Sequence, residues 1–185
     1  MPVSIPEPWR RFLADVDQQL IEPAAVHCLG GFVLTVLWGL PRATNDLDFI
    51  EIDPATANEP LLRIAGAGSE LARKYQVEFQ RVTVADHPEG YVSRLIDMTP
   101  GSLKKLRLLA FEVHDLVLAK IGRFAPRDRD DIAFLVRQNA LDLNVLIQRY
   151  EEELRPYLLN QTRYKLNLDL CLEEFFPGEN PPSSR

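Results

Sequence analysis

The sequence predicts an α+β protein in which a small sheet flanked by helices precedes a second half built from helices. Three observations carry this prediction. Short β-branched or aromatic runs alternate with helical patterns up to residue 113. From His114 onward, the strong patterns all have helical spacing. Prolines, glycine and serines crowd residues 177–185. We therefore expect an α/β core over 1–113, helices packed on it over 114–176, and a flexible tail over 177–185.

Each element is expected from a local pattern. Apolar residues at helical spacing indicate the first helix, and the apolar run Val26–Leu29 indicates a buried strand. The stretch Phe32–Trp38 is apolar nearly all round, which is typical of a buried helix, and Gly39 should end it. The pattern predicts helices over 9–20, 32–38, 61–75, 115–124, 129–139, 142–159 and 162–175, and strands over 26–29, 47–52, 77–84 and 106–113.

Composition narrows the class of protein. Hydrophobic residues make up 46% of the chain and charged residues 26%, which suits a folded domain and excludes a wholly disordered chain. The longest apolar runs fall far short of the roughly 20 residues that a membrane span needs. Cys28 and Cys171 form no disulfide framework, and the N-terminus lacks the apolar core of a secretory signal. We expect a cytoplasmic protein without a membrane partner.

Charge is distributed unevenly along a chain whose net charge is −6. This acidic balance argues against a protein that coats nucleic acid through a broad basic surface. From Arg94 to Arg129, however, eight Lys and Arg stand against four Asp and Glu, a balance of +4, so the remainder carries −10. A basic middle in an acidic chain indicates a confined anion site, although a solvated helix face would give the same count.

A glycine pair lies where a strand is expected to run into a helix. Gly30 and Gly31 follow Leu29 and precede the apolar run from Phe32. Glycines at such a junction let the backbone approach a ligand, and the helix N-terminus offers free N–H groups to an anion. Ordinary turns use glycine pairs constantly, so this feature alone favours a plain turn.

Two aspartates stand at positions i and i+2 in the run Arg42-Ala-Thr-Asn-Asp46-Leu-Asp48. On a strand they share a face, roughly 6–7 Å apart. Their carboxylates repel unless a cation lies between them, and Mg²⁺, which takes oxygen ligands and substrate phosphates, is the natural partner. A strand with solvated first residues is the alternative. The apolar Phe49 and Ile50 that follow favour a site, because they place the pair at the edge of a buried strand.

Together, the glycine pair and the acidic pair resemble the signature of the nucleotidyltransferase superfamily, which has the DNA polymerase β-like fold. The closer resemblance is to the AbiEii and MenT-like branch of toxin-type enzymes, in which an Arg-x-Thr segment precedes the acids, here Arg42 and Thr44. The resemblance implies a small mixed sheet flanked by helices, Mg²⁺ or Mn²⁺ held by Asp46 and Asp48, and an NTP as substrate. It assigns nucleotide binding to Gly30, Gly31, Arg42 and Thr44.

The second half resembles the remaining motifs of the superfamily. The helix around Lys120 resembles the second motif, and the run from Arg127 to Asp130 resembles the third, with Arg129 in place of its Lys. Independently of the resemblance, a Lys in the apolar run LVLAKI would be costly to bury without an anionic partner. The alternative is that these acids simply decorate the positive start of a helix, which explains the acids but not Lys120. We expect Lys120, Arg123 and Arg127 to contact phosphates, and the Lys120 amine to reach Asp130 or the strand acids.

The resemblance implies a Mg²⁺-dependent transfer of a nucleotide from an NTP to a hydroxyl of an RNA, such as tRNA, or of a protein. It further implies the toxin of a toxin–antitoxin pair, with a cognate antitoxin as partner. Enzymes of this fold generally add a third carboxylate, for which the candidates are Glu78, Asp86 and Asp130, and Asp130 could instead align Lys120 or activate the acceptor. The alternative is a catalytically inactive fold that serves as a binding or regulatory module.

Overall fold

The computed structural model describes residues 4–178 and divides the chain into two compact units. The first contains residues up to 83 together with 95–111, and the second contains 84–94 together with the chain from 112 onward. The inclusion of 84–94 in the second unit is a feature that local sequence patterns did not indicate. Most of the expected tail, residues 179–185, lies outside the described residues.

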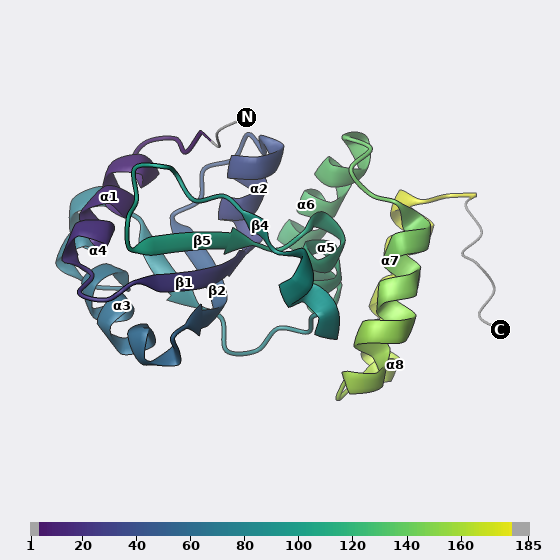
Figure 1. The fold of residues 1–185 in the computed structure, drawn as a ribbon. Helices are drawn as coiled ribbons and strands as arrows, with labels where there is room; N and C mark the ends of the chain where they lie inside the picture. Colours follow the sequence, from purple (N-terminus) through teal and green to yellow (C-terminus); the bar gives the residue numbers. More distant parts are fainter. Residues whose placement is uncertain (1–3, 179–185) are drawn as a thin grey trace. The chain divides into compact units, whose positions relative to one another are not determined.

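A mixed sheet forms the centre of the first unit (Figure 1). Within the described residues it has five strands in the order β3-β2-β1-β5-β4. β1 pairs antiparallel with β2 and parallel with β5, while β3 runs parallel to β2 and β4 antiparallel to β5. The sheet and its helices confirm the α+β class. The strands are β1 (Ala24–Leu29), β2 (Asp46–Asp53), β3 (Glu78–Arg81), β4 (Ile96–Asp97) and β5 (Leu106–Ala110).

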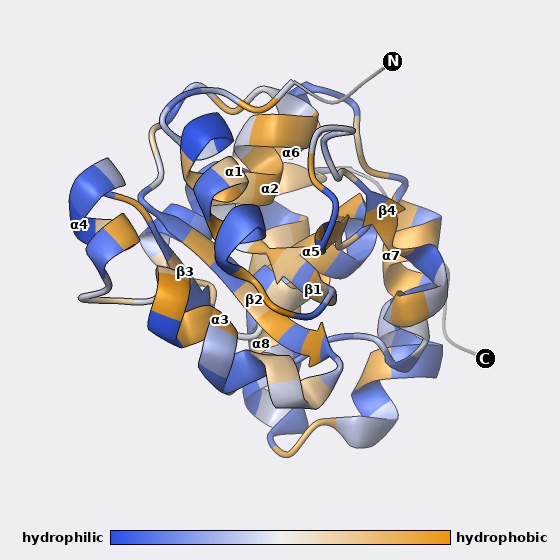
Figure 2. Cartoon of the chain, turned by 60° about the vertical axis from the view of Figure 1, so that its left-hand side comes forward, coloured by the Kyte–Doolittle hydropathy of each residue, from blue (hydrophilic) through white to orange (hydrophobic). Residues whose placement is uncertain are grey.

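Helices of the first unit bury apolar side chains against this sheet. Phe12 of α1 stacks on Phe79 of β3, with ring centroids 5.9 Å apart, and Trp9 packs on Phe32 of α2. Figure 2 shows the apolar character of α2 and of the central strands. The single helix expected over 61–75 is divided in two around its glycines. The helices are α1 (Trp9–Gln19), α2 (Gly30–Trp38), α3 (Asn58–Ala65) and α4 (Glu70–Tyr75), with a 3-10 turn η1 (Ala55–Ala57).

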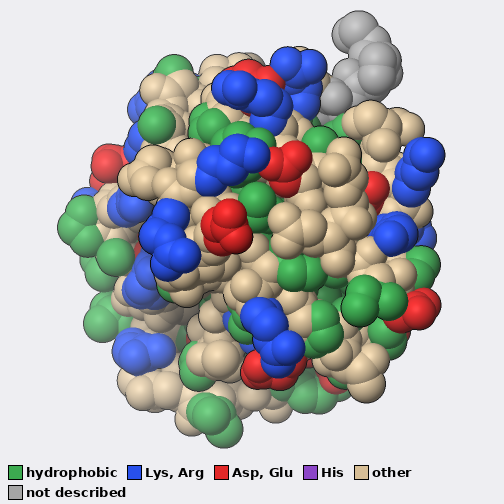
Figure 3. All heavy atoms as spheres, turned by 90° about the vertical axis from the view of Figure 1, so that its left-hand side faces the viewer, with side chains coloured by type: hydrophobic (Ala, Val, Ile, Leu, Met, Phe, Trp, Pro, Cys, Tyr) green, Lys and Arg blue, Asp and Glu red, His purple; other side chains and the backbone are tan. Residues whose placement is uncertain are grey.

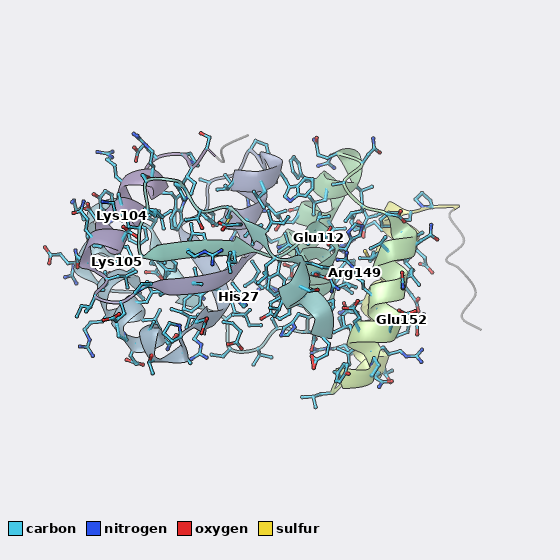
Figure 4. The ribbon with its side chains drawn as sticks, in the orientation of Figure 1. His27, Lys104, Lys105, Glu112, Arg149 and Glu152 are labelled. Carbon is cyan, nitrogen blue, oxygen red and sulfur yellow. The ribbon has the colours of Figure 1, made fainter. Side chains whose placement is uncertain are left out.

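The start of β5 is fixed to α1 by one carboxylate. Asp17 accepts hydrogen bonds from the backbone N–H groups of Lys104, Lys105 and Leu106, at 2.7–3.1 Å. Figure 4 shows Lys104 and Lys105 at this end of the sheet. Burial alone would raise the pKa of Asp17, but these donors outweigh it and lower the pKa. The carboxylate thereby satisfies backbone donors that the strand leaves unpaired.

A β-bulge in β2 keeps the acids of this strand on one face of the sheet. The register with β1 shifts opposite Ile50, which is the extra residue. Strict alternation from the buried Leu47 and Phe49 would turn Ile52 outward, whereas the bulge returns it to the buried side. The side chains on the other face of β2 are Asp46, Asp48, Glu51 and Asp53.

The second unit consists of helices, and segment 84–94 contributes one 3-10 turn to it. Its interior contains Tyr164, which stacks on Tyr150 at 5.4 Å and donates its hydroxyl hydrogen to the Leu118 carbonyl at 2.7 Å. The strand expected to reach residue 113 ends at Ala110 because Glu112 caps the next helix by accepting the His114 N–H. The elements are η2 (Glu89–Arg94), α5 (Val113–Ile121), α6 (Pro126–Arg137), α7 (Leu143–Arg149), the turns η3 (Tyr150–Leu154) and η4 (Arg155–Tyr157), and α8 (Gln161–Phe175).

Across the described residues, none of the helices has both the length and the apolar character that crossing a bilayer requires.

Candidate active site

Gly30 brings the start of α2 against the acidic pair of β2. The strand β1 ends at Leu29, which lies opposite Asp48 in the register, and α2 begins directly at Gly30. Gly30 has a φ of +81°, and a Cβ placed on it would lie 2.3 Å from Asp48 Oδ2. Only glycine fits this backbone and leaves room for the carboxylate. The two sequence features that were expected to form a site therefore meet in the folded first unit.

The loop before β2 folds back onto Gly31. A Cβ on Gly31 would lie 3.3 Å from Thr44 Oγ1 and 3.6 Å from Arg42 Nη2. The Thr44 hydroxyl donates to the Asp46 carbonyl at 3.2 Å, and Trp9 Nε1 donates to the Thr44 carbonyl at 3.3 Å. These bonds fix the loop, so the side chains of Arg42 and Thr44 lie at the first turn of α2.

The start of α2 has the properties of an anion site. In the described structure Leu29, its N-cap residue, provides no side-chain cap for the first N–H groups of the helix. These groups carry the positive end of the helix dipole. With Arg42 beside Gly31, the first turn of α2 can bind a phosphate group.

Among the three candidates for a third carboxylate, Glu78 alone belongs to the same unit as the aspartates. β3 runs parallel to β2 with Glu78 directly opposite Asp46, so the two side chains share a face of the sheet. Asp86 and Asp130 belong to the second unit. There a Cβ on Gly122 would lie 2.7 Å from Asp86 Oδ2, so Asp86 packs against the end of α5.

A polar hollow of about 380 Å³ opens beside Asp46 and Glu78. α4 provides Arg73, whose Nη1 donates to the Gly68 carbonyl at 2.6 Å, and Gln76 follows the helix. Sequence patterns gave no signal for this hollow, because its walls come from separate elements that are joined only by β3 pairing with β2. On the face of this unit that carries α1 and α4, basic side chains are interspersed with acidic ones (Figure 3). The hollow is lined by Asn45, Asp46, Gly68, Ala72, Arg73, Gln76, Val77 and Glu78.

The acidic pair fits a magnesium ion that is shared with a substrate. Across residues 4–178, no group of three or more His, Cys, Asp or Glu side chains could hold a metal by itself. Mg²⁺ usually takes one or two carboxylates and completes its octahedron with waters and substrate phosphates. Asp46 and Asp48 supply such a pair, and the missing Cβ of Gly30 lets Asp48 Oδ2 lie beside the start of α2. We call the first turn of α2 together with Arg42 the phosphate cradle. Two carboxylates beside this cradle suit a complex of a metal ion with a nucleotide.

Lys120 has the anionic partner that its buried position requires. Its amine donates to Asp131 Oδ2 at 2.7 Å and lies 3.6 Å from Asp128 Oδ1, and the residue is only 9% exposed. The expected partner within its own unit, Asp130, is exposed instead. Asp128 and Asp131 lie three residues apart on the buried face of α6, and Asp130 is turned away from that face.

The two arginines predicted for the site from the second half of the chain lie on the surface of the second unit. Arg123 is largely exposed and binds Asp128 with two hydrogen bonds, of 2.7 and 2.8 Å. Burial alone would raise the pKa of Asp128, but Arg123 and Lys120 outweigh it and lower the pKa. Asp128 also accepts the Ala125 N–H at 3.1 Å, as expected of an acid in the first turn of a helix. Arg127 is exposed.

A buried ion cluster in the second unit was not indicated by any sequence motif. Asp115 is fully buried and accepts hydrogen bonds from Arg94 at 2.9 and 3.0 Å and from Arg149 at 2.9 Å. Arg94 also binds Glu153. Arg149 also binds Glu112, and both of these residues are labelled in Figure 4. The cluster explains why segment 84–94 belongs to this unit. Its members lie up to 59 residues apart in the sequence, so only folding brings them together.

Comparison with known proteins identifies one family. The sequence model of the family described as "Nucleotidyltransferase of unknown function (DUF6036)" matches residues 12–175. A search of curated proteins and a search of solved structures each found no match. The family match confirms the expected superfamily and does not single out the AbiEii and MenT-like branch. Since the match spans both units, the chain belongs to this family of nucleotidyltransferases.

Proposed function

We propose that the protein transfers a nucleotide from an NTP to a hydroxyl group, with Mg²⁺ or Mn²⁺ as cofactor. The observation that carries this proposal is the convergence of Asp48, Thr44 and Arg42 on Gly30 and Gly31 in one unit. Asp46 and Asp48 would hold the metal ion, which when bound would neutralise charge on the phosphate oxygens. The N–H groups at the start of α2 and the Arg42 guanidinium bind the triphosphate.

The order of the strands supports an in-line geometry for the transfer. β2 lies between β1, which leads into Gly30, and β3, which carries Glu78. The phosphate cradle and the polar hollow therefore lie on opposite sides of the acidic pair. The acceptor oxygen attacks the α-phosphorus from the hollow, and the bond from this phosphorus to the bridging oxygen breaks. Pyrophosphate leaves toward the cradle, and the hydroxyl proton passes to the Glu78 carboxylate.

For the acceptor, the proposal names only a class of molecule. The resemblance to toxin-type enzymes favours an RNA such as tRNA or a protein hydroxyl, with an antitoxin as partner and the cytoplasm as location. Lys120, Arg123 and Arg127 are proposed as phosphate-binding groups, as the resemblance implies. Asp130 is exposed and turned away from Lys120, so the proposal gives the acceptor proton to Glu78 instead. The partners of Lys120 within its own unit, Asp131 and Asp128, also give it a structural role.

A transfer assay tests the proposal. The full-length protein is incubated with each labelled NTP and Mg²⁺ against total RNA and against a protein extract. We expect Asp48→Asn to lower transfer at least about 100-fold. Glu51→Gln, which alters an exposed acid of the same strand, should leave transfer unchanged. Equal transfer by the wild type and a folded Asp48→Asn variant would refute the proposed site.

The second candidate is an inactive fold that binds nucleotide as a regulatory module. Enzymes of this fold generally carry a third carboxylate, and within the described residues no cluster of three acids includes Asp46 and Asp48, which favours this candidate. Calorimetric titration with a non-hydrolysable NTP and Mg²⁺ separates the two candidates. Binding that depends on Asp48 without transfer to either acceptor pool would establish the inactive module.

A further inference from the structure

Helix α8 carries two leucines on its outer face. Leu166 is 59% exposed and Leu170 is 44% exposed, whereas Tyr164, Leu168 and Cys171 on the inner face are buried. Single exposed leucines are common on protein surfaces. Two of them one turn apart form a continuous apolar strip on this helix.

The strip belongs to a longer pattern with the spacing of a coiled coil. Arg163, Leu166, Leu170 and Glu173 are separated by three, four and three residues, so they follow one face of α8. The side chains of Arg163 and Glu173 are exposed and, within the described part of the chain, have no ion-pair partner. Their neighbours on the helix differ in this respect, because Lys165 pairs with Asp169 and Glu174 with Arg129.

The pattern is complementary to itself when a second copy runs antiparallel. The register that places Leu166 opposite Leu170 of the second copy also places Arg163 opposite Glu173 of that copy. The two-fold axis repeats both contacts in the reverse direction, as in any isologous interface. A parallel pair would instead place each Arg163 beside the other Arg163, and like charges would oppose it.

Exposed apolar residues also flank the helix. The exposed Pro177 follows it, and Leu159, which precedes α8, is 104% exposed. Tyr157, which is 62% exposed, adds apolar surface near this end. Within the helix, the leucine contacts and the charge pairs therefore agree on one alignment.

We propose that α8 is the centre of a two-fold homodimer interface in which two copies of this helix pack antiparallel. The occupant of the face is a second copy, because the charges of the helix complement themselves in the register that pairs its leucines. With 15 residues, α8 is about 22 Å long, which is short for the roughly 800 Å² per partner of a stable interface. Net charges of −6 on both copies also repel each other. The dimer is therefore of moderate strength, with a Kd of about 1–10 μM.

Sedimentation velocity of the full chain tests the dimer. Samples cover about 0.5 to 200 μM, a range that brackets this Kd. We expect the wild type to shift from monomer to dimer over this range and Leu166→Glu to stay monomeric. The matched control is Ile21→Glu, which changes another exposed apolar residue, 86% exposed in the first unit, and should dimerise as the wild type does. Circular dichroism checks that each variant is folded.

A charge-reversal series tests the register without altering the leucines. Arg163→Glu or Glu173→Arg alone should weaken dimerisation at least about tenfold by placing like charges opposite each other. The double variant Arg163→Glu/Glu173→Arg should restore it. A wild type that is monomeric at every concentration would overturn the proposal and leave the face for a different protein. A dimer that survives Leu166→Glu, or a double variant no stronger than the single ones, would overturn it too.

Discussion

Gly30 combines two requirements that no other residue meets. Its φ of +81° lies in the left-handed region, and its missing Cβ leaves space for Asp48 Oδ2. The consequence of this contact is chemical, because the same glycine that begins α2 also sets the distance between the helix N-terminus and the acidic pair. Moving the start of α2 or the acidic pair would separate the phosphate cradle from the carboxylates.

Gly30→Ala should therefore lower both stability and nucleotide binding. The strained backbone and the contact with Asp48 together cost about 2 kcal/mol or more. Gly39→Ala is the matched control, because Gly39 has a φ of +69° but, in the described structure, nothing within 4 Å of a Cβ. Urea unfolding and nucleotide titration measure both effects. Equal losses of binding in the two variants would contradict the role given to the Asp48 contact.

A second prediction for single residues concerns the two aspartates of β2, Asp46 and Asp48. Without a metal ion their carboxylates repel each other, since they share one face of the strand. Asp48→Asn should therefore leave the Tm of the ligand-free protein unchanged or raise it by a few degrees, about 1 kcal/mol in a domain of this size. Mg²⁺ with an NTP should raise the Tm of the wild type and not of the variant. A lower Tm of the ligand-free variant would show that Asp48 has a structural role instead.

At the scale of elements, α5 and α6 are joined by a buried ion pair. Lys120 contributes the cation from α5, and Asp131 and Asp128 contribute the anions from α6. Asp131 is 1% exposed, so removing the cation alone leaves a charge in a poorly solvated position. Within the second unit, the partner of Lys120 is thus Asp131 and not the expected Asp130, which changes what its substitution should do.

Lys120→Met should destabilise the fold by about 3 kcal/mol, because it removes the ammonium group that pairs with the buried Asp131 carboxylate. The double variant Lys120→Met/Asp131→Asn should recover most of that stability, since no buried charge is left unpaired. Arg129→Met, which breaks an exposed pair with Glu174, is the control and should cost less than about 1 kcal/mol.

Transfer activity of the stable double variant then decides the role of Lys120. Activity that stays lost after stability has recovered supports a part in phosphate binding. Full recovery of both would show that the residue acts only in the structure.

At the scale of the whole molecule, the buried ions of the second unit couple stability to pH. Burial alone would raise the pKa of Glu112, but hydrogen bonds and charge from His114 and Arg149 outweigh it and lower the pKa to about 2, from 4.5. A lowered pKa means that the unfolded state binds the proton first as the pH falls. The stabilisation of the fold by the ionised Glu112 carboxylate is therefore complete above about pH 4.5, and it is lost as the pH falls toward 2.

We expect a loss of about 3 kcal/mol between pH 5 and pH 2 from this group, with a smaller loss in Glu112→Gln. Glu152, exposed on η3 and labelled in Figure 4, gives the control Glu152→Gln, which should follow the wild type. Urea unfolding at a series of pH values measures the free energies. Parallel curves for the wild type and Glu112→Gln would contradict the assignment.

The sequence by itself determined the class of the fold and the first half of the candidate site. Strand and helix periods are local properties, so the elements around Gly30, Asp46 and Asp48 follow from residues within one stretch of the chain. The glycine junction and the i, i+2 acids are also local, and the family match agrees with the superfamily that they indicated.

Only the tertiary structure decided which distant residues meet. The register of β3 places Glu78 opposite Asp46, and the bulge at Ile50 corrects an alternation that the sequence alone would continue. The faces of α5 and α6 select Asp131 rather than Asp130 as the partner of Lys120. These choices depend on strand pairing and on helix packing between segments that are distant in sequence, and such contacts leave no periodic trace in the residues of either segment.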